Sequence, residues 1–175
     1  MRWLLLIAVL AMAGCTGVPE GVTPVDHFDA ARYSGRWYEI ARLDHAFERG
    51  LIDVTATYSA RDDGGIRVLN RGYDPDRKTW KEAEGKAYFV GDERTGHLKV
   101  SFFGPFYGSY VIFALDHEHY QYAAVAGPDR SYLWLLARTP QPDAATVEAL
   151  LQRADALGFD TSKLIRVEHR PAGAG

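Results

Sequence analysis

The sequence predicts an all-β protein: an eight-stranded, up-and-down antiparallel barrel with one C-terminal α-helix packed outside. Three observations support this prediction. Short segments in which apolar and polar residues alternate recur along most of the 175 residues, and turn residues separate them. Aromatic residues, which favour strands, make up 13% of the chain. A helical period appears only after Pro142, so the strands follow one another as hairpins and not as βαβ units.

Eight segments have the pattern of strands. The first begins at Gly35, which ends a short helical turn at 29–33. Residues 43–50 break the alternation and are expected to form a loop at the mouth of the barrel. Gly85 is expected to bend the long fourth strand. The predicted strands cover residues 35–42, 52–59, 66–73, 79–90, 97–102, 109–115, 120–126 and 132–138.

The chain past Pro142 predicts one amphipathic helix. Asp143 is a suitable N-cap, and Gly158 stands where a C-terminal cap belongs. Residues 164–167 are expected to add a short strand beside the first strand. The apolar residues of the helix fall on one stripe that would pack against the barrel, namely Val147, Leu150, Leu151, Ala154 and Leu157.

The first 14 residues have the form of a signal peptide, with Arg2 before an apolar run too short to span a bilayer. Cleavage after the small residues at 11 and 13 would leave Cys15 as a free thiol in an oxidising compartment. The alternative, residues 12–15 (Met-Ala-Gly-Cys), resembles the lipobox of bacterial lipoproteins, in which the cysteine is acylated. We therefore expect Cys15 to be a lipid anchor, residues 15–27 a tether, and residues 28–170 the folded domain. Thr16 points to the outer membrane, with the protein facing the periplasm.

Composition and motifs argue against several functions. A formal net charge of −3 gives no electrostatic basis for nucleic-acid binding. His117 and His119 fall at a hairpin tip without the further ligands that a metal ion needs. The sequence has no nucleophile elbow and no glycine-rich phosphate loop. We therefore expect no cofactor, no metal and no enzymatic activity.

Two residues far apart in the chain carry a resemblance to a known family. Trp37 lies at the start of the first predicted strand, and Arg138 ends the last. With further motifs spread over residues 28–168, they resemble the lipocalins, and in particular the bacterial lipoprotein branch. The resemblance implies a calycin barrel in which Trp37 is a structural plug and Arg138 lies across its indole, a cation–π pair of ~1 kcal/mol. The other motifs are Asn70-Arg71-Gly72-Tyr73-Asp74, Glu84-Gly85-Lys86-Ala87, Phe103-Gly104-Pro105-Phe106-Tyr107-Gly108, Gly127-Pro128-Asp129 and Tyr132-Leu133-Trp134.

The alternation also assigns an inward face to each strand. If Trp37 points inward, Glu39 and Ala41 lie on the same face. The family pattern implies that Tyr122 faces inward as well, together with Ala124. Because several inward side chains are small, we expect a hollow interior. The predicted ligand-binding residues are Glu39, Ala41, Val54, Ala56, Asn70, Ala83, Ala87, Phe89, Val100, Phe102, Tyr110, Ile112, Tyr122, Trp134 and Leu136.

A hollow apolar barrel beside a membrane anchor predicts a lipid-binding protein. We expect it to bind a fatty acid or a lysophospholipid, for lipid storage or transport and for envelope maintenance. Two alternatives stay open: Phe102 and Trp134 fill the barrel of a structural envelope lipoprotein, or Glu39 serves as the acid or base of an enzyme acting on a small lipophilic substrate. Phe103 and Phe106 are expected at a mouth, a dimer surface or a membrane contact, so a homodimer is also left open.

Overall fold

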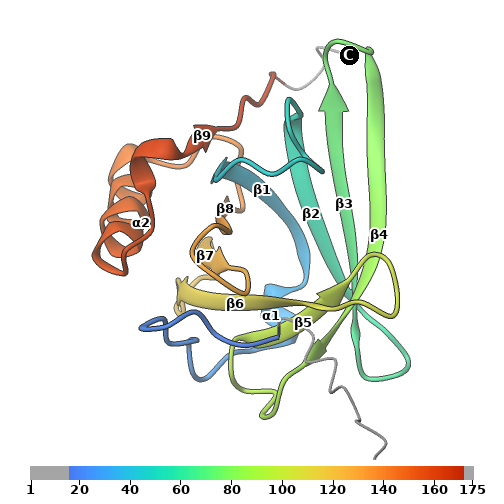
Figure 1. Ribbon diagram of the computed structural model, residues 1–175, viewed down its shortest axis with the longest axis vertical. Helices are drawn as coiled ribbons and strands as arrows, with labels where there is room; N and C mark the ends of the chain where they lie inside the picture. Colours follow the sequence, from blue (N-terminus) through green and yellow to red (C-terminus); the bar gives the residue numbers. More distant parts are fainter. Residues whose placement is uncertain (1–15, 172–175) are drawn as a thin grey trace, which may run out of the picture.

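The computed structural model describes residues 16–171, which form a closed antiparallel barrel. Each strand from β1 to β8 pairs with the next in sequence, and β8 also pairs with β1, which closes the ring (Figure 1). This arrangement confirms the predicted meander. The predicted signal peptide (1–14) and Cys15 lie outside the described residues, as do residues 172–175.

The observed elements agree with the predicted segments to within two residues at each end. The predicted short strand at the C-terminal end is confirmed, because it pairs with β1 through Ala41 and Arg42. The strands are β1 (Gly35–Arg42), β2 (Ile52–Ala60), β3 (Ile66–Asp74), β4 (Thr79–Phe89), β5 (His97–Ser101), β6 (Gly108–Leu115), β7 (Tyr122–Ala126), β8 (Leu133–Ala137) and β9 (Ile165–Arg166). The helices are α1 (Ala30–Tyr33), α2 (Ala144–Ala156) and the 3-10 helix η1 (Thr161–Lys163).

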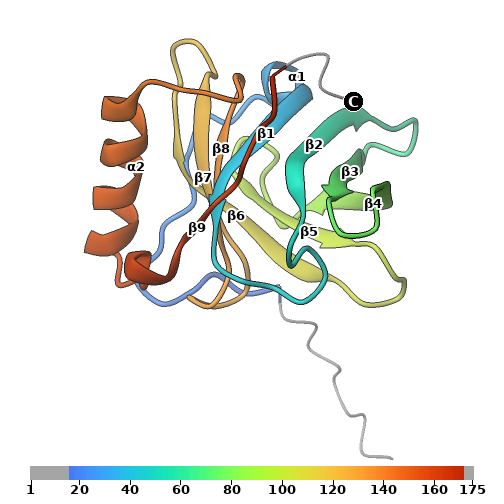
Figure 2. The same ribbon diagram turned by 90° about the horizontal axis from the view of Figure 1, so that it is seen from above.

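Helix α2 covers the outside of the barrel wall (Figure 2). It begins as predicted, because the Asp143 carboxylate accepts a hydrogen bond from the Thr146 backbone N–H at 2.8 Å. It ends before Gly158, whose φ of +81° is the left-handed conformation expected after a helix. Leu150 and Ala154 pack against the outward side chains of the strands, so the protein has an outer core beneath α2 as well as the core inside the barrel.

The barrel wall is uneven in height. Strand β4 pairs with β5 only over its last four residues, Lys86 to Phe89, so residues 79–85 pair with β3 alone. Strands β3 and β4 therefore rise above the rest of the barrel (Figure 1). The strand continues through Gly85, and this glycine is needed for close approach: a Cβ there would lie 2.7 Å from the Ser101 carbonyl oxygen.

Among the helices formed by residues 16–171, none has the length and apolar character needed to cross a membrane.

Candidate functional site: the barrel interior

The closed end of the barrel is sealed by α1 and the start of β1. Asp29 caps α1 by accepting hydrogen bonds from the backbone N–H groups of Ala31 and Arg32. The Trp37 indole N–H donates to the Tyr33 carbonyl at 2.8 Å, and the Arg138 guanidinium lies 4.0 Å from the centre of the Trp37 ring. Arg138 also donates to the backbone carbonyls of Arg32, Tyr33, Arg36 and Tyr120, so one side chain joins α1, β1 and the β6–β7 loop.

Three tyrosines form the floor of the interior. The Tyr110 hydroxyl lies 2.8 Å from that of Tyr33 and 2.7 Å from that of Tyr58. Burial strongly disfavours the phenolate, so the pKa of each of these tyrosines is raised above its usual value. The three hydroxyls therefore stay neutral and satisfy one another, which lets an otherwise apolar floor carry polar groups.

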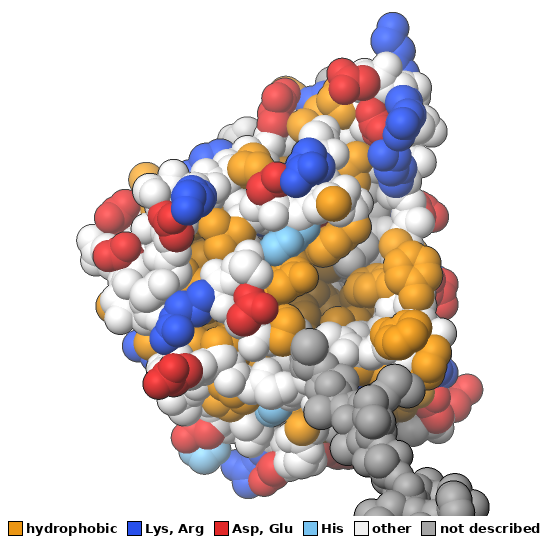
Figure 3. Space-filling model, in the orientation of Figure 1, with side chains coloured by type: hydrophobic (Ala, Val, Ile, Leu, Met, Phe, Trp, Pro, Cys, Tyr) orange, Lys and Arg blue, Asp and Glu red, His pale blue; other side chains and the backbone are white. Residues whose placement is uncertain are grey.

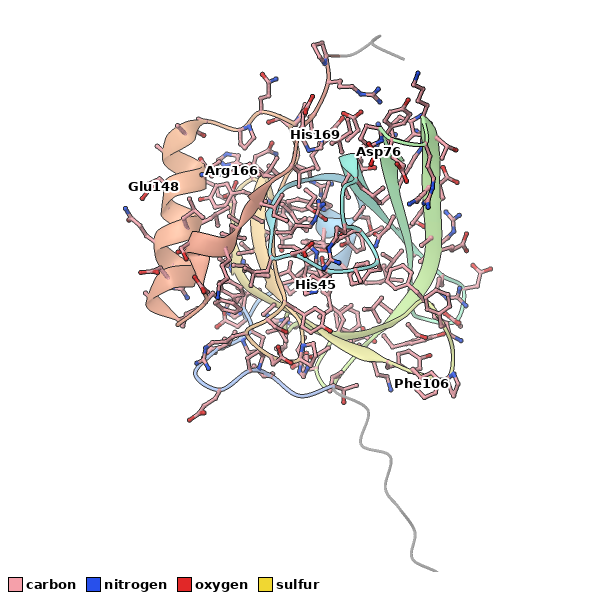
Figure 4. All side chains as sticks on the ribbon, turned by 45° about the horizontal axis from the view of Figure 1, so that its top comes forward. His45, Asp76, Phe106, Glu148, Arg166 and His169 are labelled. Atoms are coloured by element: carbon pink, nitrogen blue, oxygen red, sulfur yellow. The ribbon has the colours of Figure 1, made fainter. Side chains whose placement is uncertain are left out.

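A buried ionic cluster lies higher in the barrel. The Arg42 guanidinium, on a residue only 1% exposed, donates to the Glu39 carboxylate at 2.8 Å and to the backbone carbonyls of Glu48 and Leu51. The Trp134 indole N–H donates to the Glu48 carboxylate at 2.8 Å. Arg42 thus ties the β1–β2 loop to the inside of the barrel. In Figure 4, His45 of the same loop lies over the mouth.

Two carboxyl groups in this cluster share one guanidinium. Burial and the neighbouring Glu48 charge raise the pKa of Glu39 to about 8, against the opposing effect of Arg42. Burial also raises the pKa of Glu48, although its bond from Trp134 works in the other direction. The pair therefore retains a proton near neutral pH and titrates as a unit.

Apart from the tyrosine floor and the ionic cluster, most side chains that line the interior are apolar, and the interior is open to solvent on one side (Figure 3). Several inward side chains keep solvent access although the sheet closes around them, including Ala56, Val100, Phe102 and Trp134. Ala83 lies on the same face of β4 as the buried Ala87 and is itself exposed. Figure 3 shows the hollow between the strands, lined by hydrophobic side chains. Phe102 and Trp134 both keep partial solvent access, and the alternative in which they fill the barrel stays an alternative that a ligand titration decides.

The structure places most of the predicted lining residues inside the barrel. Glu39 lies in the ionic cluster, and Val54 is buried beside Gly72. Asn70 pairs with both Ala56 and Ala83 on the inward face. The others belong to the interior core, namely Ala56, Ala87, Phe89, Val100, Phe102, Tyr110, Ile112, Trp134 and Leu136.

The prediction that Ala41 faces inward is wrong. A β-bulge between Glu39 and Ala41 shifts the register of β1 against β8. The extra residue, Ile40, reverses the alternation, so Ala41 packs in the outer core beneath α2. Arg42 then takes the inward position, which strict alternation assigns to the opposite face.

The inward placement of Tyr122 and Ala124 is also wrong. Both pack with the outer core, and Ala123 and Val125 face the interior. The register decides this, because Ala123 pairs with the inward Leu136. The sequence of β7, Tyr-Ala-Ala-Val-Ala, has too little contrast between its faces to show it.

Sequence reasoning missed Arg42 and Glu48 as interior groups. The bulge in β1 places Arg42 on the inward face, where strict alternation does not put it. Glu48 lies in a loop, where the alternation of strand residues assigns no face. The one usable signal was the pair of ionisable residues Glu39 and Arg42 at the end of β1, on either side of the apolar Ile40 and Ala41.

The histidines at the β6–β7 hairpin lie away from the interior. Arg32 donates to the backbone carbonyls of His117 and Glu118 and stacks over Tyr120, 4.2 Å from its ring centre. Within residues 16–171, no three His, Cys, Asp or Glu side chains come together in a way that could hold a metal ion.

A closed barrel with a sealed floor and an accessible apolar interior defines a carrier of small apolar molecules. Residues 28–169 match the family model of a lipocalin-like domain, and the chain belongs to the lipocalins. It is 56% identical over 168 residues to the outer membrane lipoprotein Blc of Vibrio cholerae, covering 96% of this chain and 98% of that protein. It is 55% identical over 174 residues to the protein of the same name from Escherichia coli K12, with the same coverage.

Among solved structures, insecticyanin from the tobacco hornworm has the same fold, with a TM-score of 0.71 and 21% identity over 89% of this chain and 88% of that one. The relatives named outer membrane lipoproteins match this chain over nearly its whole length. The protein is accordingly a lipid-anchored lipocalin of the outer membrane.

Proposed function

We propose that this lipocalin binds one acyl chain inside the barrel, as a fatty acid or a lysophospholipid, and carries or stores it for upkeep of the envelope. Cys15 is the acylated residue, and the barrel faces the periplasm. The observation that carries the proposal is the set of small or partly accessible apolar side chains on the inward face: Ala56 and Ala83 lie on either side of Asn70, and Val100 lies opposite Ala87.

The energy available from such a cavity suits a reversible carrier. Burial of each CH2 group contributes ~0.8 kcal/mol, so a chain of about twelve carbons gives about 10 kcal/mol before the cost of ordering it. The net affinity should therefore be near micromolar. Binding, and not turnover, is the expected activity, because Glu39 is already held by Arg42 and by the Glu48 carboxyl.

The electrostatics of the interior suggest how a ligand lies. The ionic cluster holds two carboxyl groups and one guanidinium, and that guanidinium is already paired. Because Arg42 is balanced by the carboxylate charge of the cluster, an anionic headgroup beside it would meet no net positive charge, although the Arg42 Nε–H has no hydrogen-bond partner among the described residues. The acyl tail therefore enters first, and the headgroup stays at the mouth, where Lys81 and Arg77 lie beside Asp74.

A titration with palmitate and with a lysophospholipid tests the proposal. Trp134 lies in the interior, so its fluorescence should change on binding. Ala56→Phe would fill part of the hollow and should weaken binding at least tenfold, about 1.4 kcal/mol. The matched control is Thr57→Phe, one residue along β2 on the opposite face. Absence of binding by the folded wild-type protein, or equal loss in both variants, would contradict the proposal.

A further inference from the structure

The β5–β6 loop, residues 102–107, carries the two most exposed large apolar side chains of the described residues. Phe103 is 81% exposed and Phe106 is 72% exposed. Figure 3 shows hydrophobic side chains gathered at the right-hand edge of the molecule, where Figure 1 places this loop beside β4. Two adjacent aromatic side chains left in water at a loop tip indicate a surface that contacts something apolar.

The start of the described chain lies against the same side of the barrel. His97 Nε2 lies 3.0 Å from the Thr16 carbonyl oxygen and 3.1 Å from the Ser109 hydroxyl. The following residues also hold to the barrel: Val22 is 6% exposed, and the Val25 N–H donates to the Ile112 carbonyl. Residues 16–27, which we expected to act as a tether, are therefore held against the barrel and add no free length between Thr16 and the barrel. One peptide link, about 3.8 Å between Cα atoms, separates Thr16 from Cys15.

Strand β5 joins these two features. His97 begins the strand and Phe103 follows its end, so six residues, or about 20 Å of extended chain, separate the anchor point from the exposed aromatic loop. Lys99 lies between them and sits 5.2 Å from the centre of the Tyr107 ring. An acyl anchor at one end of this strand therefore brings its other end within reach of the same bilayer.

The side chains beside the loop are those that suit a lipid headgroup region. Tyr88 and Tyr107 lie with ring centres 6.3 Å apart, and Lys86 and Lys99 accompany them on β4 and β5. Neither lysine forms an ion pair with any carboxylate in the described part of the chain. Tyrosine is enriched where a protein meets the membrane interface, and lysine side chains are attracted to an anionic lipid surface.

We propose that this face, made of Phe103, Phe106, Tyr107, Lys86 and Lys99, is a second membrane contact. The two phenylalanines insert among the lipids of the leaflet that holds the anchor, and the lysines meet lipid phosphates. The barrel then has a fixed orientation against the membrane and does not reorient freely about its lipid anchor. This proposal rests on the acylation of Cys15 proposed above but does not require any ligand in the barrel.

The test uses the full-length, acylated protein in vesicles of phosphatidylethanolamine and phosphatidylglycerol. Acylated Cys15 has no free thiol, so Phe106→Cys can be labelled alone with an environment-sensitive fluorophore. Phe47→Cys is the matched control, since Phe47 is 66% exposed on the β1–β2 loop. The label at 106 should shift to shorter wavelength and be quenched by lipid-borne quenchers, and the label at 47 should behave as in water.

Several results would overturn the proposal. A label at 106 that remains in water would place the loop away from the bilayer. Self-quenching between labels at 106 that persists at low protein density would indicate a second copy of the chain as the occupant. Mass spectrometry of the reconstituted protein that shows no acyl groups on Cys15 would remove the anchor on which the geometry depends. A failure to bind fatty acids would leave this test unaffected, so the two proposals fail separately.

A charge variant tests the lysines. Lys86→Gln with Lys99→Gln should reduce the wavelength shift of the label at 106 on vesicles containing phosphatidylglycerol and leave it unchanged on neutral vesicles. The matched control replaces Lys163 by Gln, because that lysine is exposed but is paired with Asp160 on another part of the surface. An unchanged response to phosphatidylglycerol in the double variant would show that the lysines do not face the lipids.

Discussion

The shared proton of Glu39 and Glu48 makes the stability of the barrel depend on pH in a way that one substitution can reveal. A glutamate in the unfolded chain loses its proton near pH 4.5, whereas Glu39 in the fold keeps it to about pH 8. The folded state therefore binds more protons than the unfolded state across this window. The stability contributed by the raised pKa is fully present below pH 4.5 and is lost as the pH rises through about 8.

The size of the effect follows from the same values. One extra bound proton gives a slope of about 1.4 kcal/mol per pH unit, which flattens as the folded pKa is reached. Between pH 6 and pH 8 the wild-type protein should therefore lose about 2 kcal/mol of its free energy of unfolding through this pair. Glu39→Gln cannot ionise, yet its amide can still accept from Arg42 and donate to Glu48, so the variant should lack this loss.

Urea unfolding at several pH values, followed by tryptophan fluorescence, measures the difference. The stability of Glu39→Gln relative to wild type should rise by about 2 kcal/mol from pH 6 to pH 8. Glu84→Gln is the control, because Glu84 is exposed and paired with Arg67 on the surface, and its curve should run parallel to wild type. A Glu39→Gln curve that also runs parallel would refute the shared proton.

Three further substitutions test other parts of the barrel. Arg138→Ala should lower the free energy of unfolding by about 3 kcal/mol, because it removes the cation over Trp37 and the hydrogen bonds that Arg138 donates to four backbone carbonyls. Arg138→Lys should recover less than half of this loss in urea unfolding, and an alanine variant as stable as wild type would contradict the role of Arg138 in the plug. Tyr110→Phe should cost about 1–3 kcal/mol in the same assay, since the buried Tyr33 and Tyr58 hydroxyls lose their partner, and a neutral result would mean that water replaces it. Gly85→Ala should lower the free energy of unfolding by about 1–3 kcal/mol, because the added Cβ would collide with Ser101 and Phe102. The pairing of β4 with β5 should also weaken, which faster amide exchange at Tyr88 would reveal. Unchanged exchange would show that Ser101 and Phe102 can move aside to make room for the Cβ.

The sequence predicts the barrel well because the fold depends on many weak signals that agree. Alternation, turn residues and the Asp143 cap each specify one local element, and the closed meander is the arrangement that satisfies them together. The pairing of Trp37 with Arg138 could be expected from family resemblance alone, because nothing in their spacing brings residues so far apart into contact.

The interior was harder to predict because its register changes at single residues. The bulge at Ile40 exchanges Ala41 for Arg42 on the inward face, and no residue type in β1 marks that position. A similar irregularity in β6 lies between Ile112 and Ala114, beside the alanine-rich β7 that the predicted faces had reversed. The two-residue alternation of a strand predicts which side chains face inward only up to the next bulge, because the extra residue there reverses the faces.

The uneven height of the wall has a consequence for solubility. The upper part of β4 offers a row of unpaired backbone donors and acceptors, the kind of rim to which a strand from another molecule can add. Lys81, Glu82 and Glu84 stand along that rim, and every residue from 79 to 84 is exposed. Charged side chains on an exposed strand edge disfavour the addition of another strand, so the protein can keep one side of its mouth raised without growing into larger aggregates.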